Sequence, residues 1–244
     1  MNRMALCFFG PITYGLALAS CGQGVSREVE AVVLSLDGPA SVTHARNSRV
    51  ESIQTHSRLS VGDLIKVSGA GEARLQILPG ILGSVKANSE LQIEELRVDK
   101  DGNAMVNAML MRKARLRLRQ GILDAVVEKK DAAGATLIVD TPFGVVSATG
   151  ECVCRITVTN QRARIVSVRG QLQLQATDHV ATALDPGFFE DWPNLIGGPK
   201  AADSEVEAQE DLVEALGQER LLLLFENRAR FAPRPWHRGV AKKP

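Results

Sequence analysis

The sequence predicts an all-β fold, a compact antiparallel sandwich or roll of short strands that is followed by one C-terminal α-helix. Polar and apolar residues alternate in several short segments, which is the period of a strand with one buried and one solvated face: 74–77, 115–119 and 171–175. Turn signals separate the apolar runs, as at 37–39, 101–103 and 169–170. Helical spacing of apolar residues appears only after residue 203, so the helices that would connect parallel strands are missing from the middle of the chain.

Composition allows a packed core and narrows the classes of function. The chain has 244 residues, of which 45% are hydrophobic and 23% charged, so wholesale disorder is not expected. Aromatic residues make up only 4%, which argues against an aromatic-lined sugar cleft or a base-stacking platform. The net charge is +1, so no overall field draws the chain to nucleic acid, and we expect no nucleic-acid partner.

No motif in the sequence predicts an enzyme. There is no Gly-rich phosphate loop, no nucleophile elbow and no clustered set of histidines and carboxylates. The four histidines also lack metal-ligand spacing. We therefore expect no catalytic residues, no metal and no cofactor.

Residues 1–20 are typical of an export leader. Arg3 supplies a weakly positive start, and the apolar run that follows is broken by Gly10–Pro11 and is too short to span a bilayer. The run ends in Leu18–Ala19–Ser20–Cys21, which resembles the lipobox of bacterial lipoproteins. That resemblance implies cleavage before Cys21 and lipid on its sulfur. The alternative is an ordinary secretory signal whose cleavage site contains a cysteine.

Lipidation at Cys21 would hold the protein in the cell envelope. The resemblance implies a triacylated N-terminus, and several acyl chains anchor a protein to a membrane durably. Gly22 follows the cysteine, where an Asp would suggest retention at the inner membrane. The outer membrane, facing the periplasm, is therefore favoured in a cell with two membranes. Residues 21–28 are expected to form a short lipidated tether, flexible over 22–27.

The β-rich region, residues 29–176, carries a collinear series of motifs. Gly62–Asp63 precedes an apolar strand, and 139–144 contains a Thr-Pro-x-Gly segment that leads toward Gly150. The other members are 83–84, 88–91, 121–123 and the strand–turn–strand of 165–174. The series resembles the FecR domain family over about residues 30–175. The resemblance implies a β-domain that makes protein contacts in signalling or scaffolding and carries out no turnover.

The same motif residues have an architectural explanation. Pro142 fixes φ and lacks an amide donor, so it separates strands expected at 136–141 and 143–149. Asp63 is expected to cap or close its own turn through its carboxylate. Glycines are expected where φ is positive or backbones approach closely: Gly62, Gly121, Gly144, Gly150 and Gly170.

Two departures from the family pattern limit what it implies. FecR-type sigma regulators carry a cytoplasmic helical segment and a membrane-spanning helix before the domain, and we expect neither here, because the leader is the only apolar segment. A lipid-anchored protein outside the cytoplasmic membrane cannot hold a sigma factor directly, so that role is not expected. Glu151 and Cys152 also stand where the family more often has Thr and a large apolar residue.

Cys152 and Cys154 fall on one face of an expected strand, with Cβ atoms about 7 Å apart. A relaxed disulfide needs Cβ atoms about 3.8 Å apart, so the pair could join only with local distortion. We favour two small apolar thiols in the core over a redox pair or half of a metal site.

One strand is expected to carry a row of cations on a single face, here called the basic stripe: Lys113, Arg115, Arg117 and Arg119. Such a row would attract an acidic partner, for example an anionic glycan, a lipid head group or an acidic protein patch. The alternative is pairing across strands with carboxylates such as Glu90, Glu94 or Asp99.

The character of the chain changes after Ala176. Residues 177–202 are expected to form an irregular loop whose aromatics cover an end of the β-domain, with a docking patch as the alternative. Residues 203–226 predict an acidic helix that opens with a Ser204–Glu207 capping box and that Gly217 could interrupt. Its expected apolar face contains Val206, Leu212, Val213 and Leu216.

Residues 227–244 form a basic tail that is expected to be poorly ordered. Either the tail neutralises the acidic helix, or it extends toward an anionic envelope surface. Both outcomes are compatible with the sequence.

Together these features predict a non-enzymatic cell-envelope lipoprotein whose FecR-like domain binds another protein in envelope signalling or assembly. The alternative is an envelope glycan- or lipid-binding module that uses the basic stripe and the basic tail. A third hypothesis is a thiol-based redox or metal protein built on Cys152 and Cys154.

Overall fold

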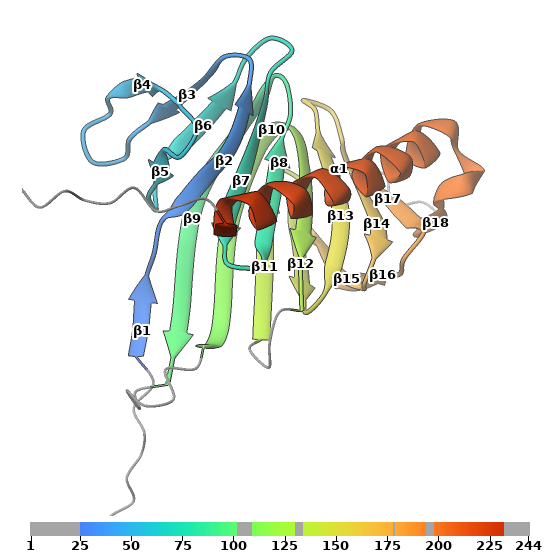
Figure 1. Ribbon diagram of the computed structural model, residues 1–244. Coiled ribbons are helices and arrows are strands. Elements are labelled where there is room, and N and C mark those ends of the chain that lie inside the picture. Colours follow the sequence, from blue (N-terminus) through green and yellow to red (C-terminus); the bar gives the residue numbers. More distant parts are fainter. Residues whose placement is uncertain (1–24, 102–108, 130–133, 178, 194–197, 232–244) are drawn as a thin grey trace, which may run out of the picture.

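The computed structural model describes residues 25–101, 109–129, 134–177, 179–193 and 198–231, so the leader and Cys21 lie outside the described residues. It confirms the predicted fold class, because the described chain is mostly strand with one long C-terminal helix (Figure 1). A 3-10 turn, η1 (Ala202–Ser204), precedes the helix α1 (Val206–Phe231). The strands are β1 (Val25–Glu28), β2 (Ala31–Asp37), β3 (Ala40–Thr43), β4 (Val50–Ser52), β5 (Arg58–Leu59), β6 (Leu64–Val67), β7 (Glu72–Leu78), β8 (Ile81–Val85), β9 (Ser89–Lys100), β10 (Met109–Val127), β11 (Gly134–Thr141), β12 (Gly144–Thr149), β13 (Cys152–Val158), β14 (Ala163–Arg169), β15 (Leu172–Ala176), β16 (Thr182–Leu184), β17 (Phe188–Trp192) and β18 (Lys200–Ala201).

The strands form two sheets. Sheet A has the order β4–β3–β6–β9–β10–β11–β12–β15–β16, and β1 pairs with the C-terminal part of β9. Sheet B has the order β5–β2–β7–β8–β10–β13–β14–β17–β18. Neighbouring strands are antiparallel, except that β10 and β11 run parallel, so sheet A is mixed rather than wholly antiparallel.

Strand β10 belongs to both sheets. Up to Gln120 it pairs with β9 in sheet A, and from Gly121 onward it pairs with β8 and β13 in sheet B. Gly121 has a φ of +95°, and a Cβ at this position would lie 2.0 Å from Ser89 Oγ, so the crossing requires glycine. With 19 residues, β10 is longer than the short strands that the sequence predicts, because it serves both sheets.

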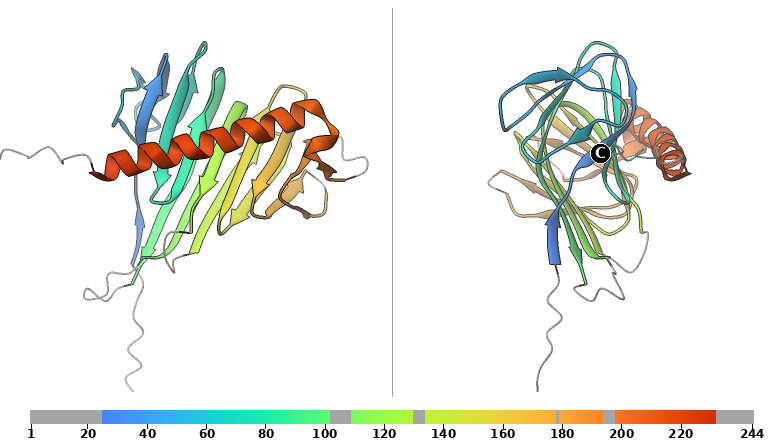
Figure 2. Two further views of the ribbon diagram at one scale, coloured as in Figure 1. Left: turned by 45° about the vertical axis from the view of Figure 1, so that its right-hand side comes forward. Right: turned by 60° about the vertical axis from the view of Figure 1, so that its left-hand side comes forward.

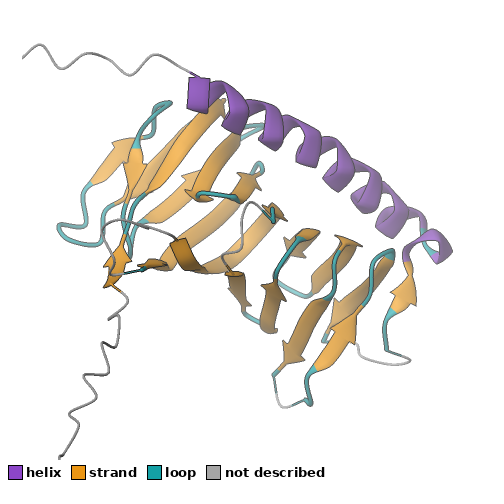
Figure 3. Cartoon of the chain, turned by 60° about the horizontal axis from the view of Figure 1, so that its bottom comes forward, coloured by secondary structure: helices purple, strands orange, loops and turns teal. Residues whose placement is uncertain are grey.

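The main core lies between the two sheets, and α1 forms a third layer on the outer face of sheet B (Figures 2 and 3). Strand β13 illustrates the arrangement. Cys152, Cys154 and Ile156 belong to the core between the sheets, whereas Val153 belongs to a second apolar cluster with Leu222 of α1. A strand that is covered on both faces shows no polar–apolar alternation, which is why β13 is apolar almost throughout.

The Thr-Pro-x-Gly segment forms the turn between two strands of sheet A. Thr141 ends β11, Gly144 begins β12, and Pro142 lies between them. A Cβ at Gly144 would lie 2.4 Å from the carbonyl oxygen of Gln175 on β15, so the close approach of these two backbones requires glycine.

The Gly-Asp motif closes the turn before β6. Asp63 is buried, and its carboxylate accepts hydrogen bonds from the amides of Ser60 at 2.9 Å and Ala45 at 3.2 Å. The carboxylate therefore holds two loop segments together, which is an architectural role. Positive φ angles also occur at Gly62, Gly150 and Gly170.

The strands begin earlier and continue later than the sequence predicts. Val25–Glu28, expected as part of the flexible tether, forms β1 and pairs with β9. The segment 177–202, expected as an irregular loop, contains β16, β17 and β18, of which β17 extends sheet B beside β14. These short strands pair backbone groups that would otherwise be left at the sheet edges. Phe189 and Trp192 on β17 are buried, so these aromatics cover the core.

Helix α1 exists where it was expected, but several details of the prediction are wrong. The helix runs unbroken through Gly217 to Phe231, beyond the expected end at 226. The capping box does not form: Ser204 Oγ donates to the carbonyl of Ala201, and Glu207 binds arginines of sheet B. Val206 and Val213 are exposed rather than buried. The face that meets the sheet instead contains Ala208, Ala215, Glu219, Leu222 and Glu226.

Candidate interaction surfaces

The basic stripe lies on β10 in sheet A, and each of its cations has a partner on a neighbouring strand. Lys113 pairs with Glu95 at 2.9 Å, and Arg117 pairs with Glu94 at 2.7 Å, both acids lying on β9. Arg119 donates to the side-chain oxygen of Gln92. The arrangement is the cross-strand pairing that the sequence left as the alternative to partner binding.

Arg115 is the member of the basic stripe that contacts two carboxylates, those of Asp140 and Glu94. It makes a bidentate contact with Asp140 of β11, at 2.6 and 2.9 Å, and also lies 3.4 Å from Glu94. The hydrogen bond with Asp140 raises the pKa of Arg115. Burial alone would raise the pKa of Asp140, but the hydrogen bond and charge of Arg115 outweigh it and lower that pKa. Three of the four cations of the stripe therefore pair with carboxylates of neighbouring strands, and Arg119 contacts only the neutral side chain of Gln92 within the described residues.

Cys152 and Cys154 are free, buried thiols in the core between the sheets. A hydrogen bond with Cys152, together with burial, raises the pKa of the Cys154 thiol well above its ordinary value. A buried thiol that stays protonated is a poor nucleophile and a poor metal ligand. In the described parts of the chain, no three His, Cys, Asp or Glu side chains gather closely enough to hold a metal ion.

The acidic helix α1 is held on sheet B by buried arginines, which the sequence did not single out. Arg155 of β13 is 2% exposed and forms a bidentate contact with Asp124 of β10, at 2.6 and 3.1 Å. The same guanidinium reaches α1, where it binds Asp211 at 3.1 Å and also Glu214. Arg155 therefore joins two strands of sheet B to the middle of the helix.

Burial and ion pairing shift the pKa values of Arg155 and Asp124 in opposite directions. Burial alone would lower the pKa of Arg155, but its carboxylate partners outweigh burial and raise that pKa. Burial raises the pKa of Asp124, and the hydrogen bond from Arg155 opposes the rise without cancelling it. Burial of the Asp124 carboxylate is thus tolerated energetically only while Arg155 pairs with it.

A second buried arginine holds the start of α1. Arg164 of β14 is 3% exposed and makes a bidentate contact with Asp191 of β17, at 2.8 and 2.9 Å. It also binds Glu205 and Glu207, which stand just before and within the first turn of α1. The guanidinium carbon of Arg164 lies 5.1 Å from the centre of the Phe189 ring, a cation–π contact.

Further polar contacts continue along the helix toward its C-terminus. Arg169 of β14 binds Glu219 at 2.6 Å. Glu226 accepts hydrogen bonds from the side chain of Gln76 and the amide of Gly80. Sheet B thus supplies polar partners to the acids of α1 that face it, and the part of the basic tail at 232–244 lies outside the described residues.

Three surface hollows lie around the segment that joins β1 to β2. One of them is a groove of about 330 Å³ between the β7–β8 turn and the paired ends of β1, β9 and β10. Val29, Leu78, Pro79 and Met109 contribute apolar atoms to it, and Arg27 and Lys100 contribute charge.

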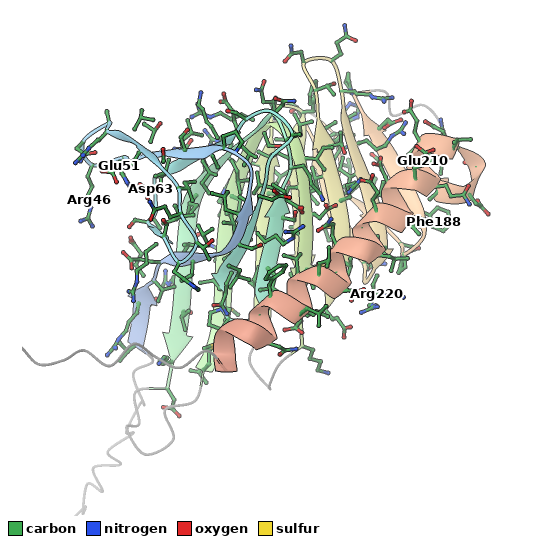
Figure 4. All side chains as sticks on the ribbon, turned by 45° about the horizontal axis from the view of Figure 1, so that its top comes forward. Arg46, Glu51, Asp63, Phe188, Glu210 and Arg220 are labelled. Atoms are coloured by element: carbon green, nitrogen blue, oxygen red, sulfur yellow. The ribbon has the colours of Figure 1, made fainter. Side chains whose placement is uncertain are left out.

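The β3–β4 lobe lies at the end of the molecule opposite the start of α1, and its Arg46 lines one of these hollows together with Glu28 and Val29. Figure 4 shows Arg46, Glu51 and Asp63 together at this lobe, far from Phe188 and Glu210 at the start of the helix. His44 Nδ1 lies 3.2 Å from a carboxylate oxygen of Asp63, and His44 Nε2 lies 3.8 Å from a carboxylate oxygen of Glu51. Strand β4 pairs only with β3 in the described structure, so it is an open edge of sheet A.

Within the described residues, no helix combines the length and the apolar character that crossing a bilayer demands. The sequence matches no known family model. It also matches none of the curated proteins.

Comparison with solved structures finds a distant likeness to a candidate anti-sigma factor of Parabacteroides distasonis ATCC 8503. Its crystal structure at 1.65 Å shares 12% sequence identity with this chain, with a TM-score of 0.39, and a second at 2.50 Å shares 13% with the same TM-score. The likeness covers 56% of this chain and 57% of that protein. This chain is thus similar, over about half of each, to a protein that carries that description.

Proposed function

We propose that this protein is a lipid-anchored, non-enzymatic component of a bacterial cell envelope, and that its FecR-like β-domain binds another protein in envelope signalling or assembly. The proposed anchor is Cys21, and the proposed location is the outer membrane facing the periplasm in a cell with two membranes. Membership of the FecR family and the lipid itself are both parts of this proposal.

The observation that carries the proposal is the spacing between the lipobox-like tetrad and the fold. Leu18–Cys21 ends four residues before Val25, where β1 is already paired with β9. Four residues span at most about 14 Å, so lipid on Cys21 would hold the sheets directly against a membrane. A tether this short suits a protein that acts at the membrane surface.

The arrangement of the surfaces favours binding by sheet A. Sheet B is occupied by α1, whereas the outer face of sheet A has no helix over it in the described structure (Figure 2). The open edge at β4 exposes Val50, of which 64% is accessible. Open edges are common sites for a partner strand in β-domains. The basic stripe is a weaker candidate, because three of its four cations already pair with carboxylates on sheet A.

The anchor is tested by labelling living bacteria that express the full chain with an alkyne analogue of palmitate. We expect the wild-type chain and Cys7→Ser to take up the label, and Cys21→Ser to take up none. Cys7→Ser is the matched control, because it removes a leader thiol and leaves the tetrad intact. Equal labelling of Cys21→Ser and wild type would contradict the proposal.

The partner is tested with a photo-crosslinking amino acid at Val50, and at Glu210 as the control. Glu210 is exposed on the solvent side of α1, away from sheet A (Figure 4). We expect a discrete crosslinked envelope protein from position 50 and none from position 210. The same pattern of products from both positions would contradict a binding role for this edge.

A further inference from the structure

The paired ends of β1, β9, β10 and β11, here called the β1 end, gather exposed apolar side chains in one place. Val25 and Met109 are both in register with Lys100, and Met111 is in register with Gly134 at the start of β11. Val25, Leu110 and Met111 are 42%, 51% and 44% exposed. Large apolar side chains grouped at one end of a sheet mark a contact surface.

Cations without ion pairs lie beside these apolar side chains. Arg27 and Lys100 both line the groove of about 330 Å³ at this end, and neither forms an ion pair within the described residues. Of the nearby acids, Asp99 pairs with Arg97 at 3.2 Å and Glu30 pairs with Arg58 at 3.3 Å, whereas Glu28 of β1 forms no ion pair within the described residues. The β1 end therefore combines exposed apolar groups with two cations that form no direct ion pair within the described residues.

The short segment between Cys21 and β1 determines which surface can lie against this end. Only residues 22–24 separate Cys21 from Val25, a distance of at most about 14 Å when fully extended. The interfacial region on each side of a bilayer is itself about 5–8 Å thick. Lipid on Cys21 would therefore bring the β1 end to the head groups, whereas β4 lies at the other end of the sheets (Figure 1).

We propose that the β1 end is a membrane-contact surface, with Leu110 and Met111 in the interfacial region and Arg27 and Lys100 against the phosphates of anionic phospholipids. This inference rests on the proposed lipidation of Cys21 and goes beyond it, because it fixes the orientation of the domain. The β3–β4 lobe, with its open edge, then points away from the membrane. Apolar groups at the interface and cations at the phosphates are the combination that surface-binding proteins use.

The test measures the depth of two labelled positions in the lipidated full-length product. A fluorophore is attached to Leu110→Cys or to Val50→Cys, and the protein is reconstituted in phosphatidylethanolamine vesicles that contain phosphatidylglycerol and a lipid with a nitroxide on its head group. We expect strong quenching at position 110 and little at position 50. Equal quenching at the two positions would overturn the proposed orientation.

Charge reversal tests the role of the cations. Arg27→Glu with Lys100→Glu should reduce quenching at position 110, because each cation near an anionic surface contributes about fivefold in affinity. Arg220→Glu, an exposed position on α1, is the matched control and should leave quenching unchanged. If the double variant and Arg220→Glu show the same quenching at position 110, Arg27 and Lys100 do not bind head groups. That result would contradict the proposed role of these cations.

The mass of the labelled protein separates the two proposals. A product without lipid on Cys21 contradicts the proposed function and this inference together. A product that carries the lipid but shows equal quenching at positions 110 and 50 contradicts only the orientation.

Discussion

Two groups of arginines in this protein make the same kind of contact in different surroundings. In the basic stripe of sheet A, Arg115 and Arg117 are 42% and 49% exposed and pair with carboxylates on neighbouring strands. Under α1, Arg155 and Arg164 are 2% and 3% exposed and pair with carboxylates of both sheet and helix.

The difference in burial determines what each group does. Exposed pairs are screened by solvent and contribute little to stability, so the stripe mainly keeps β9, β10 and β11 in register. A buried guanidinium that loses its partner, or a buried carboxylate that loses its arginine, is strongly unfavourable. The arginines of sheet B therefore fix the position of α1, and substitutions there should matter most.

The largest effect is expected at Arg155. Arg155→Met removes the bidentate partner of the buried Asp124 carboxylate, leaving only Lys86 at 3.9 Å, and should destabilise the protein by about 3–5 kcal/mol. Chemical denaturation measures the change in the free energy of unfolding. The double variant with Asp124→Leu should recover much of that loss, because it removes the unpaired charge. A double variant as unstable as the single one would contradict this explanation.

Arg164→Met should have the next largest effect, about 1–3 kcal/mol, because its partners Asp191, Glu205 and Glu207 remain partly solvated when it is removed. The loss should be local to the start of α1. Hydrogen exchange should show faster exchange in the first turns of α1 than in its C-terminal half. Uniform acceleration along the helix would contradict the local role of Arg164.

The stability of the protein should fall at acid pH as Glu72 of β7 becomes protonated. Burial alone would raise the pKa of Glu72, but hydrogen bonds from Ser84 and Lys86 and the nearby cations outweigh it and lower that pKa below 4.5. The folded protein then binds a proton at Glu72 less readily than the unfolded chain does. The contribution of Glu72 to stability is therefore fully present above the unfolded pKa of about 4.5, and it is lost as the pH falls through the folded pKa.

We therefore expect Glu72→Gln to reduce stability at neutral pH and to flatten the fall in stability below about pH 4.5. Denaturation midpoints measured between neutral and acidic pH test this expectation. Glu210→Gln, on the solvent side of α1, is the matched control. An unchanged acid slope in Glu72→Gln would contradict the assigned role.

The smallest effect is expected in the basic stripe. Arg117→Ala should change the free energy of unfolding by less than about 1 kcal/mol, and added salt should reduce the difference further. A loss comparable with that of Arg155→Met would remove the distinction between the two groups.

The fold class could be predicted from the sequence because strands with one solvated face keep their alternation. Segments 115–119 and 172–175 belong to β10 and β15, where the outward residues are polar. Short strands such as β1 and β17 could not be predicted, because they are stabilised by pairing with distant strands rather than by their local sequence.

The arginine contacts under α1 were missed for a related reason. A charged residue in an otherwise apolar strand, such as Arg155 in Cys152–Val158, signals a second covered face, but only the fold shows that α1 is the cover. Val206 and Val213 were assigned to the buried face of the helix on hydrophobicity. The sheet presents arginines there, so small residues and acids, including Ala215 and Glu219, face it instead.

The measurement that tests the central claim most directly is the intact mass of the mature protein purified from membranes. We predict a chain that begins at Cys21 and carries a diacylglyceryl group on its sulfur and an acyl chain on its amine. A chain that begins at Met1, or one whose Cys21 carries no lipid, would contradict the proposal that this β-domain acts at a membrane surface.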